Sequence, residues 1–374
     1  MHILIITPIF FPTTGGAATY YELLARGLLS SGEVERVTVI SERLPGYVNR
    51  EMDENNKIEL IRLFPHRAGG AFNKLSQYVR YAIQNVKYTS LPKLIREQKP
   101  DVVLVHSGFH NFINLLAPII CQISKSFPIV ADVRDHQMPL HRLRQLRHYH
   151  ALIACSLNVL EHIGLFDYLT ERAIHIPVLQ ENLLRERSGS GRTLAKYHLT
   201  SKSFFLYAGL VKPGKGIDLL ISTYEVLRSR GHTEELILAG VGKDFALLKK
   251  ASSVPGVRLI GGMPREELLD LMAHSRMVMN LSASEGMPRT CLEGVALGVH
   301  VLMPKGVPEF DRYCPDSVVC SSEPELVASQ IEELLAAPAD NRYPIHQHEI
   351  SHVLTQYINL FNDVRSRFIP AIHK

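Results

Sequence analysis

Short apolar runs alternate along the chain with longer segments in which apolar residues recur every three or four positions. The first run, residues 3–6, is typical of a strand that is covered on both faces. A turn-rich loop follows, and residues 17–31 then show helical spacing of leucines before a stop at Gly32. Because residues 37–40 form the next apolar run, the pattern predicts a strand–helix–strand unit with a right-handed crossover.

The same alternation continues to about residue 180 and begins again at residue 204. The polar stretch 181–203 between the two halves is typical of an interdomain connection. We therefore predict an α/β protein with two doubly wound domains that face each other across a cleft at the carboxyl ends of their strands. The expected strands are 3–6, 37–40, 102–105, 129–131, 151–155, 173–176, 204–207, 236–239, 257–260, 277–281, 299–303 and 318–319, and the expected helices are 17–31, 74–96, 111–123, 217–229, 265–274, 289–297, 323–336 and 353–368.

Composition narrows the class of protein. With 374 residues, 46% of them hydrophobic and 21% charged, the chain can bury a core and is not a disordered tail. A net charge of +4 is too balanced for a dedicated nucleic-acid binder. The apolar stretch 112–123 is too short to cross a bilayer, and the start of the chain lacks the pattern of a secretory signal, so we expect a cytoplasmic protein. Five cysteines without a CxxC pair suggest neither a disulfide framework nor a zinc site.

Two carboxylates, Glu285 and Glu293, flank a Gly-x-Pro turn and the expected start of a helix. The first amides of a helix have no partner within it, so the amides around residues 290–292 predict an anion site. A phosphate held there would have a carboxylate on either side to accept hydrogen bonds from sugar hydroxyls. The alternative is that Glu293 merely favours the helix dipole and that Glu285 is solvated.

A second glycine-rich loop, residues 209–216, again joins a strand to a helix. Lys215 is placed to offer a point charge to a diphosphate, and Gly216 lets the backbone approach closely. The alternative is a surface turn with a solvated lysine. The loop matches neither a Walker loop nor a dinucleotide fingerprint.

Taken together, these motifs resemble those of the GT-B glycosyltransferases of family 4, a retaining group. The resemblance covers nearly the whole chain and is strongest over 204–310, and it rests on Gly15-Gly16, Gly209 with Lys215-Gly216, the Glu285–Glu293 pair and Gly306-Val307-Pro308-Glu309. It implies two Rossmann-like domains facing a central cleft. Residues 1–180, with a C-terminal helix at about 355–374 crossing back, would form the acceptor-side domain, and 181–354 would bind the nucleotide-sugar donor.

The resemblance also implies roles for individual residues. Glu293 would hold the ribose hydroxyls of the donor, Glu285 the donor sugar near its C3 hydroxyl, and Lys215 the diphosphate. The N-terminal glycines would let their loop close over the donor phosphates and the acceptor, and the nucleobase would lie near 261–263. The implied donor-binding set is Gly15, Gly16, Gly209, Lys212, Lys215, Gly262, Met263, Glu285, Gly286, Met287, Pro288, Thr290, Cys291, Leu292 and Glu293.

Two positions depart from the family pattern. Leu210 stands where the family usually has an arginine, which leaves more of the diphosphate charge to Lys215, with Lys212 as a substitute. Where the family often has a histidine, this chain has Arg134 and Asp135, which are therefore our catalytic candidates on the acceptor side, with His106 a weaker one. The alternative is a buried structural pair between Arg134 and Asp135.

The expected mechanism follows from the chemistry of sugar transfer. The chain has no Asp-x-Asp motif, so lysine and helix-start amides would stabilise the leaving group, and we expect no divalent metal and no cofactor. A UDP- or GDP-linked sugar would be the donor substrate. Anomeric retention would come from front-face attack guided by the departing phosphate. The acceptor would be a glycan or a lipid-linked intermediate of cell-surface polysaccharide synthesis. The alternatives are a nucleotide-sugar epimerase and, given Leu210, an inert sugar-nucleotide-binding subunit.

Charge is concentrated in residues 65–150, which hold twelve Lys and Arg against four Asp and Glu, a balance of +8. Within this region, 74–96 and 141–148 combine basic and apolar residues, and such segments can lie on anionic membranes. Our hypothesis is that this region docks peripherally on the cytoplasmic leaflet to reach a lipid-linked acceptor. The alternative is a solvated basic surface.

Overall fold

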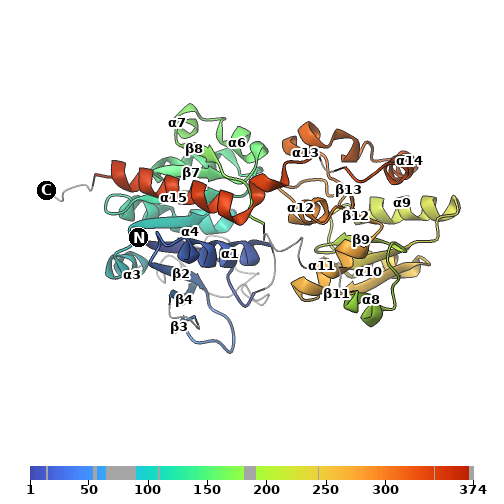
Figure 1. Cartoon of the computed structure of the whole chain (residues 1–374). Coiled ribbons are helices and arrows are strands. Elements are labelled where there is room, and N and C mark those ends of the chain that lie inside the picture. The colour runs from blue at the N-terminus through green and yellow to red at the C-terminus, as the bar shows by residue number, and fades with distance from the viewer. Residues whose placement is uncertain are drawn as a thin grey trace. The chain divides into compact units, whose positions relative to one another are not determined.

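In the computed structural model (Figure 1) the chain divides into two compact units. Unit 1 combines Met1–Leu179 with Ile350–Lys374, and unit 2 is Gln180–Glu349. The residues that the structure describes are 1–13, 16–53, 57–64, 90–107, 110–180, 191–242, 244–340 and 342–369, without the side chains of 110–115 and 245.

In the described part of unit 1, eight strands form one sheet in the order β3-β4-β2-β1-β5-β6-β7-β8. All pairs are parallel except β3–β4, which is antiparallel. Every residue of β5, β6 and β7 is buried, as expected for parallel strands covered on both faces. The strands are β1 (His2–Ile6), β2 (Arg36–Glu42), β3 (Arg50–Met52), β4 (Ile58–Phe64), β5 (Val102–His106), β6 (Ile129–Val133), β7 (Ala151–Ala154) and β8 (Ala173–His175).

The C-terminal helix α15 (Ile350–Arg367) belongs to unit 1, where it lies beside α1 (Gly16–Ser30) (Figure 1). The absence of a side chain at Gly27 lets Leu354 approach, because a Cβ there would lie 2.7 Å from a Leu354 methyl carbon. The other described helices of unit 1 are α3 (Leu91–Gln98), α4 (His110–Ile123), α5 (Leu140–Leu143), η2 (Arg144–His148), α6 (Leu157–Ile163) and α7 (Asp167–Thr170).

Unit 2 contains a parallel sheet in the order β11-β10-β9-β12-β13. Successive residues of β9 alternate between two cores, since Phe204 and Leu206 join one cluster and Phe205 and Tyr207 the other. The strands are β9 (Phe204–Ala208), β10 (Glu235–Ala239), β11 (Val257–Gly261), β12 (Met277–Met279) and β13 (His300–Leu302); the helices are α8 (Arg192–Tyr197), α9 (Ile217–Ser229), α10 (Phe245–Ser253), α11 (Arg265–His274), α12 (Arg289–Ala296), α13 (Pro308–Tyr313), η4 (Pro315–Ser317), α14 (Pro324–Ala336) and η5 (Ile345–His348).

The predicted pair of doubly wound parallel sheets is confirmed, with local corrections. The expected strand at 318–319 is a single bridge between Met303 and Val318, and the connection at 181–203 contains α8. Most of the helix expected at 74–96 lies outside the described residues. Strands β3 and β4 were not predicted, because charged residues interrupt the apolar pattern of β4. No helix in the described ranges has the length and apolarity needed to span a bilayer.

Candidate functional site

The sheet of unit 2 reverses its direction of strand addition between β9 and β12, which are neighbours although β10 and β11 separate them in the chain. Ligands of open α/β sheets bind at such a switch point, beyond the carboxyl ends of the strands. Here the loop after β9 meets the loop after β12, and the Ala283 amide donates a hydrogen bond of 3.1 Å to the Gly214 carbonyl. The two predicted glycine-containing loops are therefore joined at this edge.

Gly216 brings these two loops together. Its φ is +69°, and a Cβ at this position would lie only 2.0 Å from the Leu281 carbonyl oxygen. Only glycine combines this left-handed conformation with such a close approach. The close approach seen at Gly216 is therefore to the backbone of the neighbouring loop, and the approach to a diphosphate stays a prediction.

Lys215 and Glu285 meet at the switch point. Lys215 Nζ lies 2.6 Å from Glu285 Oε1, and the two side chains are 25% and 17% exposed. Nearby, the Tyr207 hydroxyl donates to the Leu210 carbonyl, and burial, followed by the Glu285 charge, raises the tyrosine's pKa. The ammonium group carries three donors, so it can hold a carboxylate and still face an anionic ligand.

Glu293 lies within α12 and is buried, unlike Glu285. Its Oε1 accepts a hydrogen bond of 2.6 Å from Arg265 Nη1 and lies 3.7 Å from Arg289 Nη2. Sequence reasoning missed both arginines. Arg289 precedes Glu293 by four residues, a spacing that places both on one helix face, whereas Arg265 comes from α11 and has no local signal.

The predicted anion site at residues 290–292 needs correction. The amides of Cys291 and Leu292 donate to the Pro288 carbonyl at 3.1 and 3.4 Å, so they are used within the first helical turn. Both side chains are buried in the core of unit 2, and burial raises the pKa of the Cys291 thiol. The predicted anion site is therefore restricted to the Thr290 amide and to the loop before the helix, which contains Gly286 and Met287.

The other donor-side candidates follow strands of the same parallel sheet and therefore lie at its carboxyl edge. Gly209 follows β9, and its carbonyl oxygen lies 1.8 Å from where a Cβ at Gly240 would be. Lys212 is exposed, and its carbonyl accepts the Lys215 amide at 3.3 Å. Gly262 and Met263 follow β11, and Met263 packs against one core of the unit.

The candidates in unit 1 cluster around a buried carboxylate that sequence reasoning missed, Asp132 of β6. Arg134 Nε donates to its Oδ2 at 2.9 Å, and the Tyr21 hydroxyl donates to the same oxygen at 2.6 Å. The alternative interpretation, a buried pair between Arg134 and Asp135, is wrong, since Asp135 instead accepts the Gln137 amide at 2.9 Å. Arg134 is therefore held by Asp132.

Aromatic residues fix the same cluster. The Arg134 guanidinium carbon lies 3.4 Å from the centroid of Tyr20, whose hydroxyl is 2.7 Å from that of Tyr357 on α15. His106, at the end of β5, is buried, with Nδ1 3.0 Å from Thr7 Oγ1 and its ring 4.7 Å from that of Tyr21. Gly16 begins α1, while Gly15 lies outside the described residues.

A metal site was not expected, and that expectation stays a prediction. Across the described residues, no group of three or more His, Cys, Asp or Glu side chains is arranged to hold a metal ion.

Residues 195–348, which include Lys215, Glu285 and Glu293, match the family described as glycosyl transferases group 1. The match covers less than half of the chain and lies within unit 2. Within this segment the predicted family and glycosyltransferase class are confirmed. A curated relative, O-antigen chain mannosyltransferase B of Escherichia coli, is 28% identical over 150 residues. This match covers 38% of the present chain and spans only 39% of the relative.

Solved structures resemble this chain over nearly its whole length. Sucrose-phosphate synthase of Thermosynechococcus elongatus has a TM-score of 0.74 at 15% identity, covering 98% of this chain and all of that one. HepE of Anabaena, in complex with UDP and glucose, has a TM-score of 0.73 at 15% identity, and the match covers 97% of this chain and 100% of HepE. The apo structure of OtsA has a TM-score of 0.74 at 13% identity, and the match covers 99% of this chain and 100% of OtsA. At these identities the likeness concerns the fold, and it confirms the predicted GT-B class.

Proposed function

We propose that this chain is a retaining glycosyltransferase that moves a sugar from a nucleotide-sugar to an acceptor. The observation that carries the proposal is the Lys215–Glu285 pair at the switch point of unit 2, inside the segment that matches the family. Unit 2 would bind the donor and unit 1 the acceptor. HepE, a structural neighbour, has been solved with UDP-glucose, which supports a nucleotide-linked donor.

Sugar transfer requires stabilisation of the negative charge that develops on the leaving diphosphate. Lys215 would supply a cation for this charge, with the Thr290 amide and the loop at Gly286 as further donors. The charge is stabilised without a metal, so we expect transfer to persist in EDTA. Glu285 would accept a hydrogen bond from the donor sugar, and Glu293 would hold the ribose. The departing phosphate would guide front-face attack and so retain the anomeric configuration.

In unit 1, Arg134 is the acceptor-side residue that we favour. Asp132 and Tyr20 fix its guanidinium, and Asp135 follows it directly. His106 is buried against Thr7, which suits a positioning role. A glycan or lipid-linked acceptor of polysaccharide synthesis is supported by the name of the relative, an O-antigen chain mannosyltransferase. We place the protein in the cytoplasm, at the inner face of the membrane.

The alternatives make different predictions. A nucleotide-sugar epimerase is disfavoured by the family match. An inert binding subunit would be stabilised by nucleotides without cleaving any donor. Leu210, 39% exposed where the family usually has arginine, is the feature that favours this alternative.

A donor panel tests the proposal. Thermal shifts with UDP-, GDP- and ADP-sugars identify the donor, because a ligand stabilises the fold that binds it, and release of free nucleoside diphosphate then measures its cleavage. Lys215→Ala should abolish most of this release. Lys250→Ala, which removes an exposed lysine of the same unit paired with Asp218, should not. Stabilisation without release from any donor would favour the inert subunit, and the absence of both would contradict the proposal.

A further inference from the structure

One face of unit 1 carries a column of cationic side chains that the donor and acceptor sites do not use. Between residues 140 and 149 the chain forms α5 and then the 3₁₀ helix η2. In a 3₁₀ helix, side chains three positions apart eclipse one another at about 6 Å per turn. Accordingly Leu143, Leu146 and Tyr149 are buried, while His141, Arg144 and Arg147 are exposed. The leucines at spacing three thus anchor a basic column to the unit.

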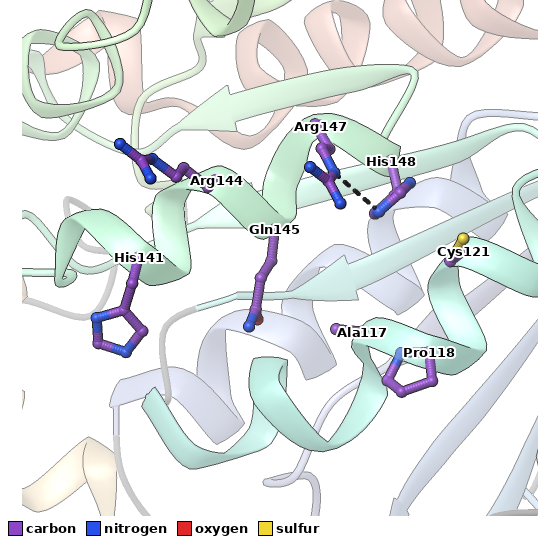
Figure 2. Close-up of a pocket in the computed structure, with 8 residues that line it drawn as sticks. All are labelled: Ala117, Pro118, Cys121, His141, Arg144, Gln145, Arg147 and His148. Carbon is purple, nitrogen blue, oxygen red and sulfur yellow. Dashed lines mark hydrogen bonds between the residues drawn. The ribbon is translucent and has the colours of Figure 1, made fainter.

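A groove of about 470 Å³ lies between this segment and α4. Its floor on α4 is Ala117, Pro118 and Cys121. Figure 2 shows His141 and Gln145 extending from α5 and η2 toward α4. All polar residues that line the groove carry nitrogen donors, and none of the lining residues is acidic.

The two arginines of the groove lack acidic partners. Arg147 Nε donates to His148 Nε2 at 3.2 Å, and the Arg144 guanidinium lies 5.6 Å from the centroid of the Phe166 ring. Over the described ranges, no ion pair is formed by either arginine. Arg230 of unit 2, by contrast, is paired with two glutamates. Neither guanidinium therefore has a carboxylate beside it that neutralises its charge.

The groove has a net charge of about +2 near neutral pH. Burial, followed by the Arg147 charge, lowers the pKa of His148, which is therefore neutral and accepts the hydrogen bond from Arg147. Guanidinium groups bind the several oxygens of a phosphate through two parallel hydrogen bonds, and they bind a phosphate more specifically than a lysine does. We propose that this groove binds the phosphate group of a ligand.

The groove is distinct from the site of sugar transfer. It lies against the second half of α4, which leads to the amino end of β6, and against η2, which leads to the amino end of β7. Donor and acceptor chemistry in such a fold belongs to the carboxyl edge. The ligand would therefore be anchored away from the reacting atoms. Its phosphate could belong to a phospholipid headgroup or to a soluble phosphate ester.

The test compares the whole protein with Arg144→Gln/Arg147→Gln. The matched control, Arg26→Gln/Arg367→Gln, makes the same charge change at two exposed arginines of unit 1 that have acidic partners. Inorganic phosphate is titrated by calorimetry at low ionic strength, where surface charges are least screened. The groove variant should bind phosphate about tenfold more weakly, whereas the control should match the wild type. Nucleoside diphosphate binding serves as an independent check of unit 2.

A second arm distinguishes the source of the phosphate. Flotation with neutral phosphatidylcholine vesicles and with vesicles containing phosphatidylglycerol is measured for all three proteins. Loss of binding to the anionic vesicles in the groove variant alone identifies a headgroup site; weaker phosphate binding without a change in flotation identifies a soluble ester. Equal phosphate affinity in the wild type and the groove variant overturns the proposal. That result would leave the glycosyltransferase assignment untouched, because the donor panel tests it separately.

Discussion

Replacing Glu285 by glutamine separates the two functions proposed for this residue. In the structure its carboxylate holds Lys215 at 2.6 Å. A diphosphate that binds Lys215 shares the ammonium group with this carboxylate, which weakens the ion pair, and it also lies close to the negative charge of Glu285. Glu285→Gln preserves the size of the side chain and removes the charge. We therefore expect the variant to bind free nucleoside diphosphate more tightly, although it loses activity.

The magnitude follows from the environment of the pair. With side chains 25% and 17% exposed, the ion pair is worth about 1 kcal/mol. Repulsion between the carboxylate and a phosphate about 8 Å away adds about 2 kcal/mol at an effective dielectric constant of 20, which salt reduces to about 1 kcal/mol. The sum of about 2 kcal/mol corresponds to roughly thirtyfold tighter binding.

Calorimetry with the nucleoside diphosphate and with its sugar conjugate measures the effect. The conjugate should gain less affinity than the free diphosphate, because Glu285 would also accept a hydrogen bond from the sugar under the proposed function, and the rate of sugar release should fall. Glu267→Gln, at an exposed ion pair with Lys196, is the control and should leave both affinities unchanged. Weaker diphosphate binding by Glu285→Gln would refute the reasoning, since it would mean that the carboxylate holds Lys215 in its binding position.

Three further predictions concern stability. Glu293→Gln removes a buried carboxylate from between two arginines, so denaturant unfolding should show a loss of about 3 kcal/mol, against less than 1 kcal/mol for the exposed Glu267→Gln. Gly216→Ala should lower the free energy of unfolding by well over 2 kcal/mol in the same measurement, because its Cβ would clash with the Leu281 carbonyl. Gly214→Ala, also at positive φ but with open space around it, should lower it by about 1 kcal/mol. Equal losses in the two variants would contradict the proposed clash. Burial, and then the Arg172 charge, lowers the pKa of His150. The unfolded state therefore takes up a proton near pH 6.5 that the folded state does not, and the free energy of unfolding should fall as the pH drops from 7 to 5.5. A His150→Gln variant whose stability shows the same dependence on pH would contradict this prediction.

The sequence predicted the fold where burial alone decides the pattern. Strands such as β5 and β9 are apolar throughout because both of their faces are covered, and their positions were predicted closely. Strand β4 was missed because Glu59 and Arg62 are charged yet buried. Arg36 and Arg50 pair with Glu59, and Glu51 pairs with Arg62 at 2.7 Å. These partners lie on other strands, so local pattern does not reveal that the charges are compensated.

The same reasoning explains which site residues could be predicted. Lys215 and Glu285 each follow a strand, which is a local signal, but their pairing across 70 positions depends on β9 and β12 being neighbours. The Arg265–Glu293 contact likewise depends on helix packing. The pair of Asp132 and Arg134 was accessible to sequence reasoning, since residues two apart at a strand end share one face.

The position of α15 in unit 1 has a consequence for how the protein is made. Unit 2 is one continuous segment, Gln180–Glu349, inserted into a unit whose last helix is encoded at the far end of the chain. During translation the inserted unit can fold as it leaves the ribosome, whereas α1 waits for α15 to cover Gly27 and to supply the tyrosine partner of Tyr20. Truncation before residue 350 should therefore damage the unit at the opposite terminus, so expression of Gln180–Glu349 is the simpler route to an isolated half.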